Sequence, residues 1–355
     1  MPSFSHTVPE DFLKAERLDK YIASLPEGIN RSRLKSGVTS ILVNGKKSKL
    51  STKVSPKDFI QIEWEESVPE DIEPQNIPLD IIYEDENVTV INKKQGMVTH
   101  PAAGNWEGTL VNALLFHWGR NAIHNEDEKE NPSVLQARRP GIVHRLDKDT
   151  SGIIITARNR DTETFLARQF KNHNSLSKIY IAICQGPPPV QEGIIRTNIA
   201  RDIRDRKKFR ALDEESDGKL AVSKFKCIGC YGPYSLIKIK IYTGRTHQIR
   251  VHLKWLGCPI VGDPIYSKPV KGSLLEGAPL MLHAFKLKIR IPGKAENIKK
   301  DEKGRAVFIS KVPVRFKIAL KKLHQNFQKS LPENKKEYGK IPVLKARKGY
   351  GQWQK

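Results

Sequence analysis

Apolar residues near the start of the chain recur at the spacing of an α-helix. Residues 11–25 place several large apolar side chains near one helical face, and residues 29–41 predict a second short helix. The dipeptide Asn44-Gly45 separates two short apolar stretches, which is the strongest local signal for a β-hairpin. Apolar and polar residues then alternate over 58–65, as they do in a half-buried strand. We therefore predict a small helix-and-hairpin module over residues 11–65.

A second pattern begins after residues 66–77, which are rich in proline and acid and indicate a linker. From 78 to 322 most apolar stretches alternate as strands do, and helical spacing appears at 109–118 and 161–172. The clearest predicted strands are 79–93, 152–158, 177–186, 218–229, 234–244 and 282–292. Strands joined by both hairpins and helices predict an α+β domain with a largely antiparallel central sheet and flanking helices. Residues 323–355 are basic and weakly patterned, so we expect a flexible tail that faces RNA.

Charge identifies the kind of partner. The chain of 355 residues has 62 Lys and Arg against 39 Asp and Glu, a net charge of +23, which predicts attraction to a polyanion such as nucleic acid. The alternative, an anionic membrane surface, lacks the basic amphipathic helix that it would need. In the small module the residues expected to contact RNA phosphates, without reading bases, are Arg31, Arg33, Lys35 and Lys46.

Several classes of protein are disfavoured by what the sequence lacks. We find no signal peptide and no apolar run of membrane-spanning length, which predicts a soluble, cytoplasmic protein. Four cysteines are too few for a disulfide scaffold, and the one Cys-x-x-Cys motif, Cys227 to Cys230, has no second pair to complete a zinc site. No phosphate-binding loop or dinucleotide fingerprint is present. We therefore expect no cofactor and no metal.

Two stretches contain charged residues that suggest chemistry. In GIVHRLDKDTSGIIITAR, residues 141–158, Asp147 immediately precedes an apolar run that predicts a buried strand. In the second, Arg245 and Arg250 flank an expected strand-to-helix transition. A guanidinium can orient a carboxylate through two hydrogen bonds, and an oriented carboxylate can attack a sugar carbon or take a proton. Such a pairing is more often structural, so the residues alone leave both interpretations open.

Six stretches, in the same order, resemble those of the RluA-type pseudouridine synthases. They are IIYEDENVTVINK, HPAAGNWEGTLVNALL, GIVHRLDKDTSG, SKIYIAICQG, TGRTHQIRVHL with GDPIY, and LHAFKL. The leading module resembles the S4 RNA-binding domain through RLDKYI, RSRLKSG and VNGK. The resemblance covers roughly residues 15–320 and is strongest to the ribosomal large subunit pseudouridine synthase D group. It implies the pseudouridine synthase fold preceded by an S4-type domain.

The resemblance also implies an activity and the residues that perform it. The activity would be isomerisation of specific uridines in large-subunit ribosomal RNA, free or in a precursor particle, by a monomeric enzyme. Asp147 matches the essential aspartate, Tyr180 the tyrosine that stacks on the target uracil and helps to remove the proton from C5, and Arg250 the arginine that pairs with the aspartate. On the RNA side, Arg145 matches an arginine that enters the RNA, and we expect Arg245 and His247 to contact the substrate.

Two other functions remain open at this point. A non-catalytic assembly factor for the ribosome could use the same fold to bind RNA, but it would have no need of Asp147, Tyr180 and Arg250 together. A base-removing glycosylase would use paired carboxylates and would release free uracil.

Overall fold

The computed structural model describes residues 3–12, 16–25, 34, 38–64, 72–102, 104–119, 141–172, 175–205, 207–293 and 298–330. The chain divides into two compact units, Met1–Asp71 and Ile72–Lys355. Each unit has its own hydrophobic core.

The first unit is a small antiparallel sheet with a short helix. Its elements are β1 Ser3–Thr7, β2 Glu16–Arg17, α1 Leu18–Ser24, β3 Val38–Val43, β4 Lys46–Lys47, β5 Lys53–Val54 and β6 Phe59–Trp64. The main sheet has the strand order β1-β6-β3-β4, and β2 pairs with β5. Asn44 and Gly45 join β3 to β4 with φ values of 52° and 73°, as a two-residue hairpin turn requires. The predicted hairpin and the strand predicted over 58–65 are therefore confirmed.

Three predictions in this unit were wrong at their boundaries. The helix expected over 11–25 begins only at Leu18, because residues 16–17 pair with β5 instead. The helix expected over 29–41 cannot include its last residues, since Val38–Val43 is strand β3, whose β-branched residues pair with β6. Strand β1 lies before the start that we expected for the module. Most of 29–37 lies outside the described residues.

The second unit contains one large sheet, which has ten strands in the described part of the chain. The strand order is β12-β11-β13-β14-β10-β15-β9-β8-β7, with β16 paired to β15. The strands are β7 Ile81–Glu84, β8 Val88–Lys93, β9 Ser151–Ala157, β10 Ser177–Gln185, β11 Glu192–Arg201, β12 Phe209–Leu212, β13 Lys219–Tyr231, β14 Tyr234–Ile241, β15 Leu282–Ile289 and β16 Ala306–Ile309. Among the described pairs only β9 and β15 run parallel. The prediction of an α+β domain with a largely antiparallel sheet is confirmed.

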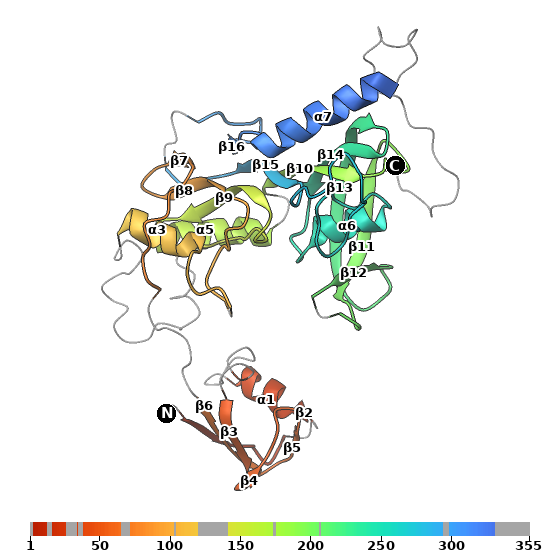
Figure 1. Cartoon of the computed structure of the whole chain (residues 1–355). Coiled ribbons are helices and arrows are strands. Elements are labelled where there is room, and N and C mark those ends of the chain that lie inside the picture. Colours follow the sequence, from red (N-terminus) through yellow and green to blue (C-terminus); the bar gives the residue numbers. More distant parts are fainter. Residues whose placement is uncertain are drawn as a thin grey trace. The chain divides into compact units, whose positions relative to one another are not determined.

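Four helices in the described part of this unit accompany the sheet, as Figure 1 shows. They are α3 Leu110–Trp118, α5 Arg160–Lys171, α6 Gln248–Trp255 and α7 Val314–Ser330. The side chains of Thr109 and Asn159 cap α3 and α5 by accepting backbone N–H groups of the first turn. The helices predicted over 109–118 and 161–172 are thus confirmed.

The start that we expected for the C-terminal tail was wrong, because helix α7 extends beyond it. We placed that start at residue 323, whereas α7 continues to Ser330. Leu323 packs into the core together with Phe316 and Ala319, which share one helical face at spacings of three, four and seven residues. The rest of the predicted tail, 331–355, lies outside the described residues.

Strands β9 and β15 approach so closely at the centre of the sheet that only glycine fits at residue 152. Gly152 has a φ of 115°, and an added Cβ would lie 2.3 Å from the carbonyl oxygen of Ala284 and 2.6 Å from its nitrogen. The parallel pairing of β9 with β15 occurs at these residues. Because Asp147 lies five positions earlier in the chain, this contact fixes where the loop that carries it leaves the sheet.

We expect Gly152→Ala to lower the free energy of unfolding by about 3 kcal/mol or more, because it adds both backbone strain and a clash with backbone atoms. Gly232→Ala is the matched control. Gly232 also has a positive φ, 63°, but an added Cβ would meet nothing within 4 Å. That variant should lose only about 1–2 kcal/mol. Urea denaturation measures the free energy of unfolding of both variants. Equal decreases in the two variants would contradict the close approach of β9 and β15.

Candidate active site

Segment 93–99 holds the backbone on both sides of Asp147. The bonds run from Thr99 Oγ1 to Leu146 O (3.0 Å), from Gly96 N to Lys148 O (2.9 Å) and from Gln95 Nε2 to Asp149 O (3.0 Å). The amide N–H of Thr150 also donates to the carbonyl of Asp147 itself, at 3.0 Å. Because the flanking carbonyls are all bound, the backbone that presents the Asp147 carboxylate has little freedom.

Lys93 lies beneath this loop with an exposed fraction of only 1%. Its ammonium donates to three backbone carbonyls, those of Lys94, Met97 and Lys148, at 3.0, 2.8 and 3.1 Å. Burial lowers the pKa of Lys93 to about 7, although the nearby Asp147 and Asp149 favour its charged form. Lys93 therefore joins segment 93–99 to the loop of Asp147.

Arg250 of α6 contacts two carboxylates. Its Nε and Nη2 donate to the two oxygens of Asp263 at 2.7 and 2.8 Å, a bidentate pair in which the Asp263 side chain is completely buried. Its Nη1 lies 3.4 Å from Oδ2 of Asp147. Burial lowers the pKa of Arg250, but the pairing with Asp263 outweighs burial, so the pKa lies above its usual value. Asp263 thus fixes the guanidinium that faces Asp147.

His247 faces the same carboxylate, with its Nε2 3.9 Å from Oδ2 of Asp147. The hydroxyl of Tyr266 accepts the N–H of Phe209 and lies 2.9 Å from Nδ1 of His247, so it can donate to that nitrogen. Burial lowers the pKa of His247, although the charge of Asp147 acts to raise it. The net effect favours the neutral ring. When the Tyr266 hydroxyl donates to Nδ1, the neutral imidazole carries its proton on Nε2, toward Asp147.

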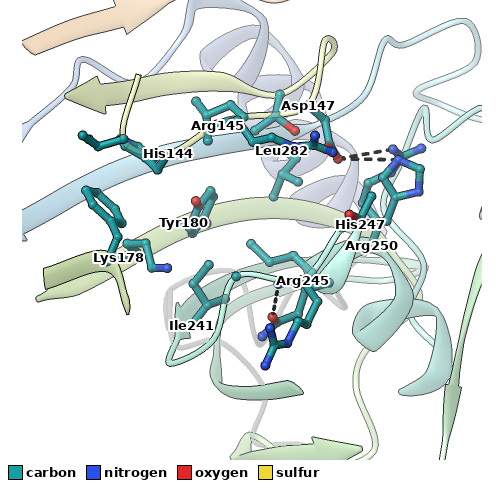
Figure 2. Close-up of a pocket in the computed structure, with 18 residues that line it drawn as sticks. His144, Arg145, Asp147, Lys178, Tyr180, Ile241, Arg245, His247, Arg250 and Leu282 are labelled. Atoms are coloured by element: carbon teal, nitrogen blue, oxygen red, sulfur yellow. Dashed lines mark hydrogen bonds and ion pairs between the residues drawn. The ribbon is translucent and has the colours of Figure 1, made fainter. Parts of the chain in front are cut away.

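A cavity of about 300 Å³ opens beside these groups. Tyr180 of β10 lines it and is 7% exposed, and burial together with the charge of Asp147 raises the pKa of its phenol. Ile241 of β14 and Leu282 of β15 form part of the apolar lining (Figure 2). The cavity is wide enough for a flat heterocycle, with a charged end at Asp147 and an aromatic surface at Tyr180.

The structure brings six of the residues selected from the sequence to this one cavity, namely Asp147, Tyr180, Arg250, Arg145, Arg245 and His247. Arg145 is exposed at its edge, and Nε of Arg245 donates to the carbonyl of Leu220 at 2.9 Å. Lys46 lies in β4 of the first unit, far along the chain from these groups. The other three predicted phosphate contacts, Arg31, Arg33 and Lys35, lie outside the described residues.

Sequence reasoning missed several residues of the site. Asp263 stands in the quoted GDPIY stretch, but nothing in the pattern showed that it would pair with an arginine thirteen residues earlier. Lys178 also lines the cavity, two residues before Tyr180 on the same strand, and this i to i+2 spacing was the signal that could have identified it. His144 also lines the cavity, and its Nε2 accepts the N–H of Ile155 at 3.0 Å, which is a structural role.

The described residues contain neither a metal-binding cluster of His, Cys, Asp and Glu nor a helix long and apolar enough to cross a membrane. Cys227 and Cys230 both lie in β13 with their sulfurs 3.2 Å apart, and neither forms a disulfide. What the cavity offers is a fixed carboxylate, a guanidinium beside it and an aromatic surface. This set can perform nucleophilic or proton-transfer chemistry on a sugar that bears a flat base.

Comparison with known proteins agrees with that chemistry. Residues 87–255 match the RNA pseudouridylate synthase family. The chain is 44% identical over 330 residues to the ribosomal large subunit pseudouridine synthase D of Borreliella burgdorferi, which covers 91% of this chain and 92% of that protein. It is 38% identical over 275 residues to a protein of the same name from Zymomonas mobilis, covering 76% of this chain and 83% of that one.

One solved structure supports the fold. Human RNA pseudouridylate synthase domain containing 4 superposes with a TM-score of 0.51 at 24% identity, covering 69% of this chain and 92% of that chain. At that identity the likeness concerns the fold alone, and it confirms the pseudouridine synthase fold expected for the second unit.

Proposed function

The chain belongs to the RNA pseudouridine synthase family, and we propose that it converts uridines of large-subunit ribosomal RNA to pseudouridine with Asp147 as its catalytic carboxylate. The geometry supports this role because Asp147 is the acidic group that both Arg250 and His247 face in the cavity. The RNA substrate is inferred from the names of the two relatives above, which align with 91% and 76% of this chain.

The reaction needs only groups that the cavity supplies. Asp147 either adds to C1′ of the ribose or takes the proton from C2′, and the bond from C1′ to N1 of uracil breaks with its electron pair on the base. The base turns against Tyr180, and C5 then forms a bond to C1′. At this step the bond from C1′ to the Asp147 oxygen breaks on the first route, whereas on the second route Asp147 returns the proton to C2′. The C5 proton leaves to water and N1 takes up a proton, which restores the conjugated ring. Because the phenol pKa is raised, Tyr180 enters the reaction protonated and presents a neutral ring face.

The target uridine must leave its helix to reach the cavity, which costs a few kcal/mol of unstacking. Arg145, which is exposed at the edge of the cavity, would occupy the space that the base vacates. The first unit would act as an S4-type RNA-binding domain, with Lys46 among its phosphate contacts. We further propose that the enzyme works as a monomer in the cytoplasm, where ribosomal RNA is made into subunits.

The test uses unmodified large-subunit ribosomal RNA with tritium at uracil C5. Release of tritium to water, without free uracil, is the expected result for the unsubstituted protein. Binding should weaken as salt rises, because phosphate contacts release counterions. Release of free uracil would instead indicate a glycosylase. Tight, salt-sensitive binding to RNA and to a ribosomal precursor particle, with no tritium release from either, would indicate the assembly factor.

A further inference from the structure

Lys178 is a buried cation in the substrate cavity without a carboxylate partner. It lies on β10 and is 8% exposed, and in the described part of the chain no Asp or Glu forms an ion pair with it. Its ammonium lies 5.8 Å from the centre of the Phe170 ring, a contact with a neutral group. Burying an unpaired charge is costly, so such a residue is a candidate for contact with a ligand that arrives with opposite charge.

The position of Lys178 relative to Asp147 defines what it can touch. Lys178 and Tyr180 stand two residues apart on one strand, so both side chains lie on the cavity face of the sheet. Figure 2 shows Tyr180 between Lys178 at one end of the cavity and Asp147 with Arg250 at the other. A uridine with its ribose at Asp147 and its base on Tyr180 therefore directs the far edge of the base toward Lys178.

Gly244 lines the cavity beside this ammonium and has no side chain to cover it. An added Cβ at Gly244 would lie 3.5 Å from Nζ of Lys178, so the glycine leaves room beside the charge. Burial lowers the pKa of Lys178 to about 8, which leaves most of the amine protonated at neutral pH. The other cation deep in the site, Arg250, is already paired with Asp263. Lys178 is thus the buried cation of this cavity that remains available to the base.

We propose that Lys178 is a catalytic residue that stabilises the negative charge on the uracil as it detaches. When the bond from C1′ to N1 breaks, its electron pair passes to the base and is shared among N1, O2 and O4. An ammonium that donates to a carbonyl oxygen of the base stabilises this charge. The base becomes neutral when C5 bonds to C1′, and the C5 proton then leaves while N1 takes up a proton. A preorganised donor in a site shielded from water binds the charged base more strongly than the neutral uridine.

The experiment compares Lys178→Met and Lys178→Arg in single turnover on two ribosomal transcripts, one made with uridine and one with 5-fluorouridine. The rate is the loss of the parent nucleoside after nuclease digestion, because 5-fluorouridine has no C5 proton to release. Fluorine withdraws electrons from the base, so the negative charge on the departing base needs less stabilisation by Lys178. We expect Lys178→Met to lose about 100-fold in rate on uridine and clearly less on 5-fluorouridine. Lys178→Arg, which retains a cation, should lose less than Lys178→Met on uridine. Lys238→Met is the control, because Lys238 is exposed and lies on the opposite face of β14.

Equal losses of rate on the two transcripts would overturn the proposal, as would a loss confined to RNA affinity, which would indicate a phosphate contact. Thermal unfolding of Lys178→Met distinguishes a catalytic role from a structural one. Removal of an unpaired buried charge should leave the melting temperature unchanged or raise it. A lower melting temperature together with equal losses would assign Lys178 a structural role. This inference rests on the proposed function, and the unsubstituted protein tests that function separately by its conversion of the uridine transcript.

Discussion

Asp147→Asn is expected to abolish tritium release, with a fall in single-turnover rate on the order of 10⁴-fold. The amide keeps the shape of the side chain and can still accept a hydrogen bond from Arg250, which lies 3.4 Å away. It can neither add to C1′ as a carboxylate does nor take a proton from C2′. The backbone bonds that segment 93–99 makes around residue 147 involve carbonyls of its neighbours, so the variant should fold normally and bind RNA with unchanged affinity.

Asp149→Asn is the matched control, because it makes the same chemical change two residues away. The fold uses the carbonyl of Asp149, which accepts from Gln95 at 3.0 Å, and the substitution leaves that carbonyl in place. Most of the activity should therefore remain. A rate for Asp147→Asn within about tenfold of the unsubstituted protein would contradict the catalytic role. Rates are measured with enzyme in excess, and filter binding and thermal unfolding confirm that both variants bind and fold.

The motif at residues 141–158 shows how far the sequence could predict the site. Asp147 followed by an apolar run predicted a carboxylate at the start of a buried strand, and β9 begins at Ser151 with all seven residues buried. The resemblance to known synthases then selected Tyr180 and Arg250, which lie at the same cavity. These residues could be found because each stands in a local pattern, either an alternating strand or a short collinear motif.

Residues that act through long-range contacts escaped prediction. Lys93 reaches a carbonyl 55 positions away, and Gln95 reaches the carbonyl of Leu280, 185 positions away. The pairing of such groups depends on the order of the strands, which periodicity does not determine. The helix expected over 29–41 failed for a related reason, because the pairing of β3 with β6 outweighs the local helical spacing of its last residues.

The pairing of Asp263 with Arg250 leads to the second large effect, on stability as well as on rate. Asp263→Asn leaves the Arg250 guanidinium, whose side chain is 6% exposed, without the carboxylate that neutralises it. Breaking one partner of a buried pair costs about 3–5 kcal/mol, so we expect the free energy of unfolding to fall by that amount. The guanidinium also loses its fixed position opposite Asp147, and a small displacement of this kind lowers the rate by about 100-fold.

Glu214→Gln removes one partner of an exposed ion pair. Comparing it with Asp263→Asn shows how much of the loss of stability is due to burial of the pair. Glu214 binds Arg196 at 2.6 Å, a contact as short as that of Asp263, but the two side chains are 45% and 50% exposed. Water screens that pair, so its loss should cost less than about 1 kcal/mol and leave the rate unchanged. Urea denaturation gives both stabilities. Equal and small decreases in the free energy of unfolding of the two variants would show that Arg250 finds another partner. Asp147 is the nearest other carboxylate, 3.4 Å from Arg250. The rate of Asp263→Asn would then show how well the catalytic aspartate functions in a closer ion pair.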